Sequence, residues 1–258
     1  MTSVAVSGSF DDPRSRHVRF LDEAAKLGDL HVMLCSDEVA TAIDGKPPKF
    51  PLAERKYFIE AIKFVRRVSV VERPGEWDAV EPGEELCVLD SAGGRQSGRV
   101  ISEEKLKIFP TPPAARSISA AGRKKVLVTG CFDWVHTGHV RFFEEVSELG
   151  DVYAVVGSDA NIELLKGVGH PLFRQDERCY MVGAVRYVKL AVVSTGKGWL
   201  DAEPEIRVIR PDAYAVNEDG DKPEKRKFCE ENGIEYIVLK REPKQGLTRR
   251  QSTALRGF

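Results

Sequence analysis

The sequence predicts an α/β fold built from two copies of one domain, each a parallel sheet covered by helices on both faces. The first observation is an internal duplication: S-G-S-F-D-D-P-R-S-R-H-V-R-F-L-D-E-A-A-K-L-G-D from Ser7 aligns without a gap with T-G-C-F-D-W-V-H-T-G-H-V-R-F-F-E-E-V-S-E-L-G-D from Thr129. The second is that each copy opens with a β-branched run, an amphipathic helical pattern and another apolar run. That order is typical of a βαβ unit, whose two strands are parallel.

The second copy continues this alternation of strands and helices. Its first strand is expected at residues 126–129, and its first helix ends at Leu149-Gly150-Asp151. Apolar periodicity and turn residues then predict, in order, a loop near Lys166, a helix at 177–187, strands at 190–193 and 213–216, a helix at 222–232 closed by Gly233, and a strand at 236–239.

The duplication also gives the expected domain bounds. P-L-A-E-R-K-Y-F-I-E-A-I-K-F-V from Pro51 follows the pattern of the second copy from Phe173, which sets Arg55 against Arg178. Between the copies, residues 109–122 are rich in Pro, Ala and Ser, a composition typical of linkers. We therefore expect a first domain at 1–115, a linker at 116–123 and a second domain at 124–258.

Bulk composition excludes several classes of partner. Lys plus Arg (39) nearly equals Asp plus Glu (40), so no overall field attracts nucleic acid or an anionic membrane. The five cysteines have no metal-ligand spacing and are expected to be free thiols in a reducing compartment. No apolar run approaches the roughly 20 residues that a membrane span needs. We expect a cytoplasmic protein with small-molecule partners.

A strand-to-helix turn in the second copy contains two histidines. In V-L-V-T-G-C-F-D-W-V-H-T-G-H, His136 and His139 lie at the start of the helix that follows the first strand. A helix N-terminus offers unpaired backbone N–H groups and a partial positive charge, and Gly138 leaves room for a phosphate. Either histidine alone could be a cap or a core residue. Ligands of α/β domains bind at this end of the strands, however, which favours a phosphate site.

The motif T-G-C-F-D-x-x-H-T-G-H resembles that of the cytidylyltransferase-like nucleotidyltransferases, an H-x-G-H superfamily with Rossmann-like domains. The resemblance covers nearly all of 124–258. The stretch 166–188 is similar to ethanolamine-phosphate cytidylyltransferases, which also have two copies; glycerol-3-phosphate cytidylyltransferases and heptose-phosphate adenylyltransferases are similar too. The resemblance implies that His136, His139 and Lys166 are catalytic. It implies nucleotide binding by Thr129, Gly130, Cys131, Phe132, Asp133, Gly138 and Arg178, although a surface ion pair is the alternative for Arg178.

The C-terminal part departs from the family pattern. Members usually show an arginine followed by a G-x-S-T-T type motif that binds phosphates, whereas this chain ends K-Q-G-L-T-R-R-Q-S-T-A-L-R-G-F. We expect Ser252 and Thr253 to be the hydroxyl pair and Arg249 or Arg250 to be the cation. After the fourth strand, V-N-E-D-G-D places Asn217 and Glu218 where members show a glycine and aspartates. All six residues are predicted to bind the nucleotide.

The activity that the resemblance implies is transfer of CMP from CTP to a small phosphorylated or phosphonate acceptor, with release of pyrophosphate. Mg²⁺, bound mainly through the nucleotide phosphates, is the expected cofactor, and no metal site made of protein ligands is expected. The preference for CTP comes from the stretch 166–188 alone. Two alternatives stay open: adenylyl transfer from ATP to a sugar phosphate such as heptose phosphate, and a nucleotide-binding scaffold or sensor without turnover.

The first copy is expected to be non-catalytic. Arg14 replaces the first histidine and Arg16 replaces the glycine, so that only His17 remains. An arginine at the glycine position would fill the space that a phosphate needs, and a solvated loop or an anion-sensing pocket are the two interpretations of this arginine pair. Because single-copy relatives commonly form homodimers, as the resemblance implies, we expect the two copies to pack as an intramolecular pseudo-dimer. A further homodimer stays open.

Overall fold

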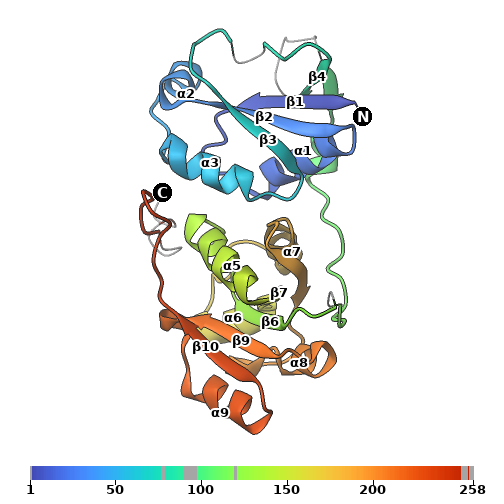
Figure 1. Cartoon of the computed structure of the whole chain (residues 1–258), viewed down its shortest axis with the longest axis vertical. Helices are drawn as coiled ribbons and strands as arrows, with labels where there is room; N and C mark the ends of the chain where they lie inside the picture. The colour runs from blue at the N-terminus through green and yellow to red at the C-terminus, as the bar shows by residue number, and fades with distance from the viewer. Residues whose placement is uncertain (1, 77–78, 90–97, 119–120, 251–254, 256–258) are drawn as a thin grey trace. The chain divides into compact units, whose positions relative to one another are not determined.

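The computed structural model describes residues 2–76, 79–89, 98–118, 121–250 and 255 (Figure 1). The chain divides into two compact units, Met1–Phe109 and Pro110–Phe258. Each unit contains one five-stranded sheet, and every strand pair in both sheets is parallel. The predicted fold class, two α/β units with parallel sheets, is confirmed.

The first unit has the strand order β3-β2-β1-β4-β5. The chain moves outward from β1 in one direction through β2 and β3, and then returns to the other side of β1. Its elements are, in chain order, β1 (Ser3–Gly8), α1 (Ser15–Ala25), β2 (Asp29–Cys35), α2 (Asp37–Asp44), α3 (Leu52–Glu60), β3 (Val65–Val71), β4 (Glu84–Leu89), β5 (Arg99–Ile101) and α4 (Glu103–Leu106).

The second unit repeats this topology with the order β10-β9-β6-β7-β8. The direction of winding reverses at β6, and in such sheets ligands bind beyond the carboxyl ends of the strands at the reversal. The elements are β6 (Lys125–Gly130), α5 (Thr137–Leu149), β7 (Asp151–Val156), α6 (Asp159–Lys166), α7 (Gln175–Gly183), β8 (Val188–Val193), η1 (Gly198–Leu200), α8 (Glu203–Ile209), β9 (Ala213–Asn217), η2 (Glu218–Gly220), α9 (Pro223–Glu231) and β10 (Glu235–Leu239).

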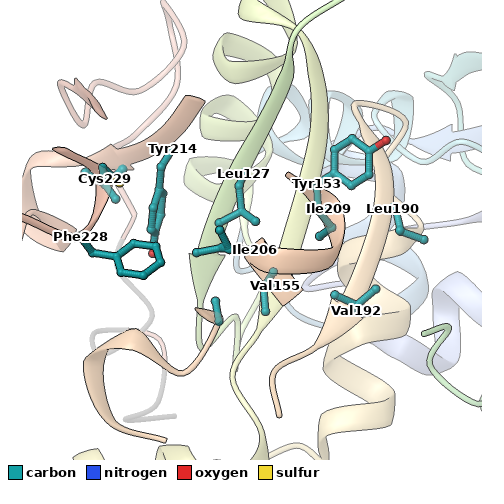
Figure 2. Packing of buried hydrophobic residues seen from close by; sticks show 12 residues of the cluster. Leu127, Tyr153, Val155, Leu190, Val192, Ile206, Ile209, Tyr214, Phe228 and Cys229 are labelled. Carbon is teal, nitrogen blue, oxygen red and sulfur yellow. The ribbon is translucent and has the colours of Figure 1, made fainter. Parts of the chain in front are cut away.

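The core of the second unit includes a helix that the sequence pattern does not predict. Ile206 and Ile209 of α8 belong to one buried cluster with Leu127, Tyr153 and other side chains of the sheet (Figure 2). The seven residues of α8, E-P-E-I-R-V-I, are too few and too rich in β-branched side chains to give a helical signal. Helix α9 adds to the same cluster, so α8 and α9 cover one face of the sheet. Helices α5 and α7 contact the sheet without joining this cluster and cover the other face.

Three segments differ from their predicted form. Residues 159–166, where no helix was predicted, form α6, so that Lys166 is the last residue of a helix and the predicted loop begins after it. Helix α7 ends at Gly183, earlier than the predicted end at 187, because tight turns follow: the Val185 N–H donates to Val182 O at 3.2 Å and the Val188 N–H to Val185 O at 3.0 Å. The segment 110–118, inside the region of linker composition, packs on the second unit. There the Ile118 N–H donates to Tyr153 Oη at 2.7 Å.

Two expectations from composition concern the cysteines and the membrane. All five cysteines are free thiols, as predicted, and four of them are buried. Within the part of the chain that the structure describes, no helix has the length and apolar character that crossing a bilayer requires.

Replacing Ile209 by alanine tests the role of α8. The Ile209 side chain is fully buried, whereas its neighbour Val208 is 50% exposed. We expect Ile209→Ala to lower the free energy of unfolding by about 2–5 kcal/mol because it leaves a cavity, and Val208→Ala to change it by less than about 0.5 kcal/mol. Urea unfolding of the full chain measures both. Equal losses would show that α8 is not a core element.

Candidate functional site

The two predicted histidines cap α5 reciprocally. His136 is the N-cap residue, and its Nδ1 accepts a hydrogen bond from the Gly138 N–H at 3.0 Å. His139 Nδ1 accepts from the His136 N–H at 3.3 Å, and the two ring centroids are 4.1 Å apart. A backbone N–H can only donate, so both Nδ1 atoms are acceptors. In the neutral form each imidazole therefore has its proton on Nε2.

Both histidines are strongly biased toward the neutral form. Burial lowers the pKa of His139 to about 3, with further lowering by the positive charges of Arg241 and Lys166. Burial also lowers the pKa of His136, helped by His139, Arg241 and Arg250. His136 Nε2 is buried and has no hydrogen-bond partner among the described residues. In the neutral ring this Nε2–H is therefore a hydrogen-bond donor without an acceptor among the described residues, at the start of a helix.

Two glycines and a strained aromatic residue fix the shape of the turn. A Cβ on Gly138 would lie 2.8 Å from His136 Cε1, so any side chain there would displace the ring. Phe132 has a φ of 50°, in the left-handed region, and its ring would lie 2.7 Å from a Cβ on Gly130. The Phe132 ring also packs edge-on against His139, with centroids 5.5 Å apart. Glycine is thus required at both positions by the side chains of the turn itself.

Asp133 and Arg178 connect this turn to the loop before α7. Asp133 Oδ1 accepts from the backbone N–H groups of Leu172 and Phe173 at 2.8 and 2.9 Å. The Arg178 side chain is 1% exposed and donates to the backbone oxygens of Phe173, Cys131 and Gly157 and to the carboxylate of Asp159. Its predicted contact with the nucleotide stays a prediction. These hydrogen bonds make Arg178 a brace for the site, and its burial excludes an ion pair on the exposed surface of the helix.

A cleft of about 870 Å³ opens at the carboxyl ends of the strands in the second unit. The structure brings nine of the predicted site residues together in its wall, whereas His136 and Arg178 are buried behind it and Glu218 does not line it. Asn217 Oδ1 at the end of β9 is buried and has no hydrogen-bond partner among the described residues. The nine are Thr129, Gly130, Cys131, Phe132, Asp133, Gly138, His139, Lys166 and Asn217.

Arg241 is a cleft residue that the sequence prediction missed. It forms an ion pair with Asp219 and donates to Arg250 O at 3.4 Å. It also lines the cleft, and its charge lowers the pKa of both histidines. A signal for it was present: the family pattern calls for an arginine before a glycine motif, and Arg241 precedes Gly246.

The other C-terminal predictions have mixed outcomes. Arg249 and Arg250 line a small hollow with Gly138, next to the helix N-terminus. Glu218 forms an ion pair with Arg249, with 3.8 Å between Glu218 Oε1 and the guanidinium nitrogen of Arg249. Ser252 and Thr253 lie outside the described residues, and their roles stay predictions.

The first unit keeps the bracing interactions of this site but only one of its two histidines, His17. Asp11 accepts from the backbone of Lys49 and Phe50, as Asp133 does in the second unit. Arg14, at the position of His136, forms an ion pair with Asp12 at 2.7 Å. Arg16, at the position of Gly138, forms an ion pair with Glu103. Both arginines are therefore paired with carboxylates of their own unit.

Comparison with known proteins adds a family match. A family model described as cytidylyltransferase-like matches residues 127–255. The bifunctional protein HldE of Campylobacter concisus is 40% identical over 164 residues, which cover 62% of this chain and 32% of that protein. The bifunctional protein HldE of Wolinella succinogenes is 28% identical over 185 residues, 70% of this chain and 36% of that protein. This chain thus spans about a third of the length of these relatives.

A solved structure is also similar. The lipopolysaccharide core biosynthesis protein from Thermoplasma volcanium GSS1 is 20% identical, with a TM-score of 0.39, and the match covers 50% of this chain and 100% of that chain.

The lowered histidine pKa values predict a specific pH response. Between pH 8 and pH 5 the imidazole NMR signals of His136 and His139 should not shift. The titration midpoint of an unperturbed histidine, in contrast, is at a pH of about 6.5. The folded state then binds fewer protons than the unfolded chain below that pH. Stability should therefore fall as the pH drops from about 6.5 toward 3, and the slope should be smaller in His139→Asn. A midpoint near pH 6.5 for either ring would contradict the burial argument.

Proposed function

Because the chain belongs to the cytidylyltransferase-like family, we propose that it transfers a nucleoside monophosphate from a nucleoside triphosphate to the phosphate or phosphonate group of a small acceptor, with release of pyrophosphate. One observation supports this most strongly. At the N-terminus of α5, His136 and His139 are held as neutral rings with their protons on Nε2, and His139 lines a cleft large enough for a nucleotide.

In this reaction an oxygen of the acceptor attacks the α-phosphorus of the nucleotide. A new P–O bond forms while the bond to the bridging oxygen breaks, and the electron pair leaves with pyrophosphate. The Nε2–H of His139, which lines the cleft, donates to an oxygen that gains negative charge, and Lys166 and Arg241 offset the remaining charge. The resemblance implies the same role for His136, whose ring lies behind the wall of the cleft. Neither histidine has to accept a proton, and no covalent enzyme intermediate forms.

Mg²⁺ is the cofactor that we propose, held mainly by the phosphates of the nucleotide. Among the described residues, no three His, Cys, Asp or Glu side chains lie close enough together to hold a metal ion. Asp133 is the aspartate of the motif, and one of its carboxylate oxygens already accepts two backbone N–H groups. Mg²⁺ often binds through substrate phosphates with few protein ligands, and it would supply positive charge on the leaving pyrophosphate.

The nucleotide is CTP or ATP, and two observations favour different ones. The stretch 166–188 is similar to ethanolamine-phosphate cytidylyltransferases, which favours CTP. Both relatives described above are named bifunctional protein HldE, and the sequence also resembles heptose-phosphate adenylyltransferases, which favours ATP and a sugar phosphate. We keep adenylyl transfer as the second candidate for this reason.

The first unit, in this proposal, does not catalyse. Its Arg14 and Arg16 occupy the positions of a histidine and a glycine, and both are held by carboxylates of the same unit. Packing of the two copies as a pseudo-dimer stays a prediction. A scaffold or sensor without turnover is the alternative of another class, and it would bind nucleotide but release no pyrophosphate.

A matched pair of variants tests the histidine donors. Asparagine places an acceptor oxygen near the position of Nδ1 but has no donor at the position of Nε2. His139→Asn should therefore keep the cap and lower the rate of pyrophosphate release by on the order of 10²- to 10³-fold. His17→Asn changes the equivalent residue of the first unit, whose Nδ1 accepts from the Arg14 N–H at 2.9 Å. It should leave the rate unchanged, and an equal loss in both variants would count against the proposal.

The nucleotide can be identified by thermal shift of the full chain with Mg²⁺ and either CTP or ATP. A ligand at 100 times its dissociation constant stabilises the folded state by about 2.7 kcal/mol, which raises the melting temperature measurably. A shift with only one nucleotide identifies the donor. Binding without pyrophosphate release, across a panel of phosphorylated alcohols and sugars, would instead support the sensor.

A further inference from the structure

Lys225 is a buried lysine in the wall of the cleft. It lies in the first turn of α9 and is 9% exposed. Its Nζ donates one hydrogen bond, to Thr129 Oγ1 at 3.2 Å, and lies 5.5 Å from the centre of the Tyr214 ring. The hydroxyls of Thr129 and Tyr214 are themselves 2.6 Å apart. Neither lysine nor tyrosine here belongs to the motif from which the site was predicted.

This ammonium group has no anionic partner among the residues that the structure describes. In the described part of the chain, no carboxylate lies within ion-pair distance of Lys225. Asp201 is close enough to raise the pKa of Lys225, but burial lowers that pKa by more. An ammonium has three donors, and the described residues accept from only one of them. Because burying an unpaired charge is unfavourable, a fold that tolerates it is preorganised for an anion.

Another part of the cleft wall is held in place by hydrogen bonds. Asn161 holds Gly198 through two hydrogen bonds, of 3.1 Å to its oxygen and 2.7 Å from its N–H. These bonds fix the next residue, Trp199, which lines the cleft with its side chain 49% exposed. Lys225, Thr129, Asn161 and Trp199 all line the cleft that contains His139.

We propose that Lys225 and the Thr129 hydroxyl bind the anionic phosphate or phosphonate group of the acceptor, and so help to select which compound receives the nucleotide. This rests on the proposed function, and it assigns to the acceptor both Lys225, which is outside the motif, and Thr129, for which the resemblance implies nucleotide binding. The nucleotide phosphates are left to the histidines, Lys166 and Arg241. An anion at Lys225 would also restore the pKa that burial has lowered.

The test uses inorganic phosphate as the probe and the full chain saturated with a non-hydrolysable α,β-methylene nucleotide. Titration calorimetry measures both affinities in the wild type, Lys225→Met and Lys227→Met. Lys227 is the matched control because it lies on the same helix with its side chain 76% exposed. We expect phosphate to bind the wild type and Lys227→Met equally, and Lys225→Met at least about 10-fold more weakly, since hydrogen bonds to charged groups are the stronger ones. The affinity for the analogue should be the same in all three.

Three results would overturn the inference: equal phosphate affinity in all variants, no phosphate binding to the wild type, or a loss in Lys225→Met of affinity for the analogue alone. The last would assign Lys225 to the nucleotide. If Lys225→Met does not fold by circular dichroism, Lys225→Gln takes its place. If the chain binds phosphate through Lys225 but does not bind the nucleotide analogue, the proposed function is rejected and the anion site at Lys225 is kept. Failure of the proposed function can therefore be distinguished from failure of this inference.

Discussion

The reciprocal cap at the start of α5 is the interaction on which the candidate site depends. Two backbone N–H groups, of His136 and Gly138, each donate to an imidazole Nδ1 and thereby set the tautomer of both rings. Helix capping is normally a contribution to stability of about 1 kcal/mol. Here the same hydrogen bonds decide which nitrogen has the proton, and hence that each ring offers a donor. The cap also requires Gly138, since a Cβ there would contact the His136 ring at 2.8 Å.

The duplication separates the interactions that maintain the fold from those that serve chemistry. Arg55 and Arg178 occupy equivalent places, and each is buried while donating to backbone oxygens and to one aspartate. Such an arginine closes the turn after the first strand in either copy, so it is kept whether or not the site is used. The histidine at 136 is different, because Arg14 takes its place without loss of the strand order. The copies therefore share a scaffold, and only the second has both donors.

Much of this could be predicted from the sequence, and the gaps have physical causes. The βαβ pattern and the duplication predict the parallel sheets, and the spacing of His136 and His139 predicts a shared site, because these are local features of the chain. Helix α8 was missed because its helical state is decided by burial against the sheet and not by its own seven residues. Lys225 was missed because it reaches the cleft from an element far along the chain, which only the folded topology brings to β6. Arg241 was missed because Arg249 and Arg250, nearer to the Ser-Thr pair, fit the cation of the family pattern.

The charge state of the site limits the chemistry that it can perform. Burial lowers the pKa of both His136 and His139 and so favours their neutral form near pH 7, and their Nδ1 atoms are already engaged as acceptors. These two histidines therefore offer no free nitrogen that could take a proton from a nucleophile. A phosphate monoester needs no such base, because its second pKa is about 6 and it is already mostly a dianion at pH 7. Neutral donors beside fixed cations thus suit an acceptor that arrives ionised, and a free alcohol in its place would lack the base that it requires.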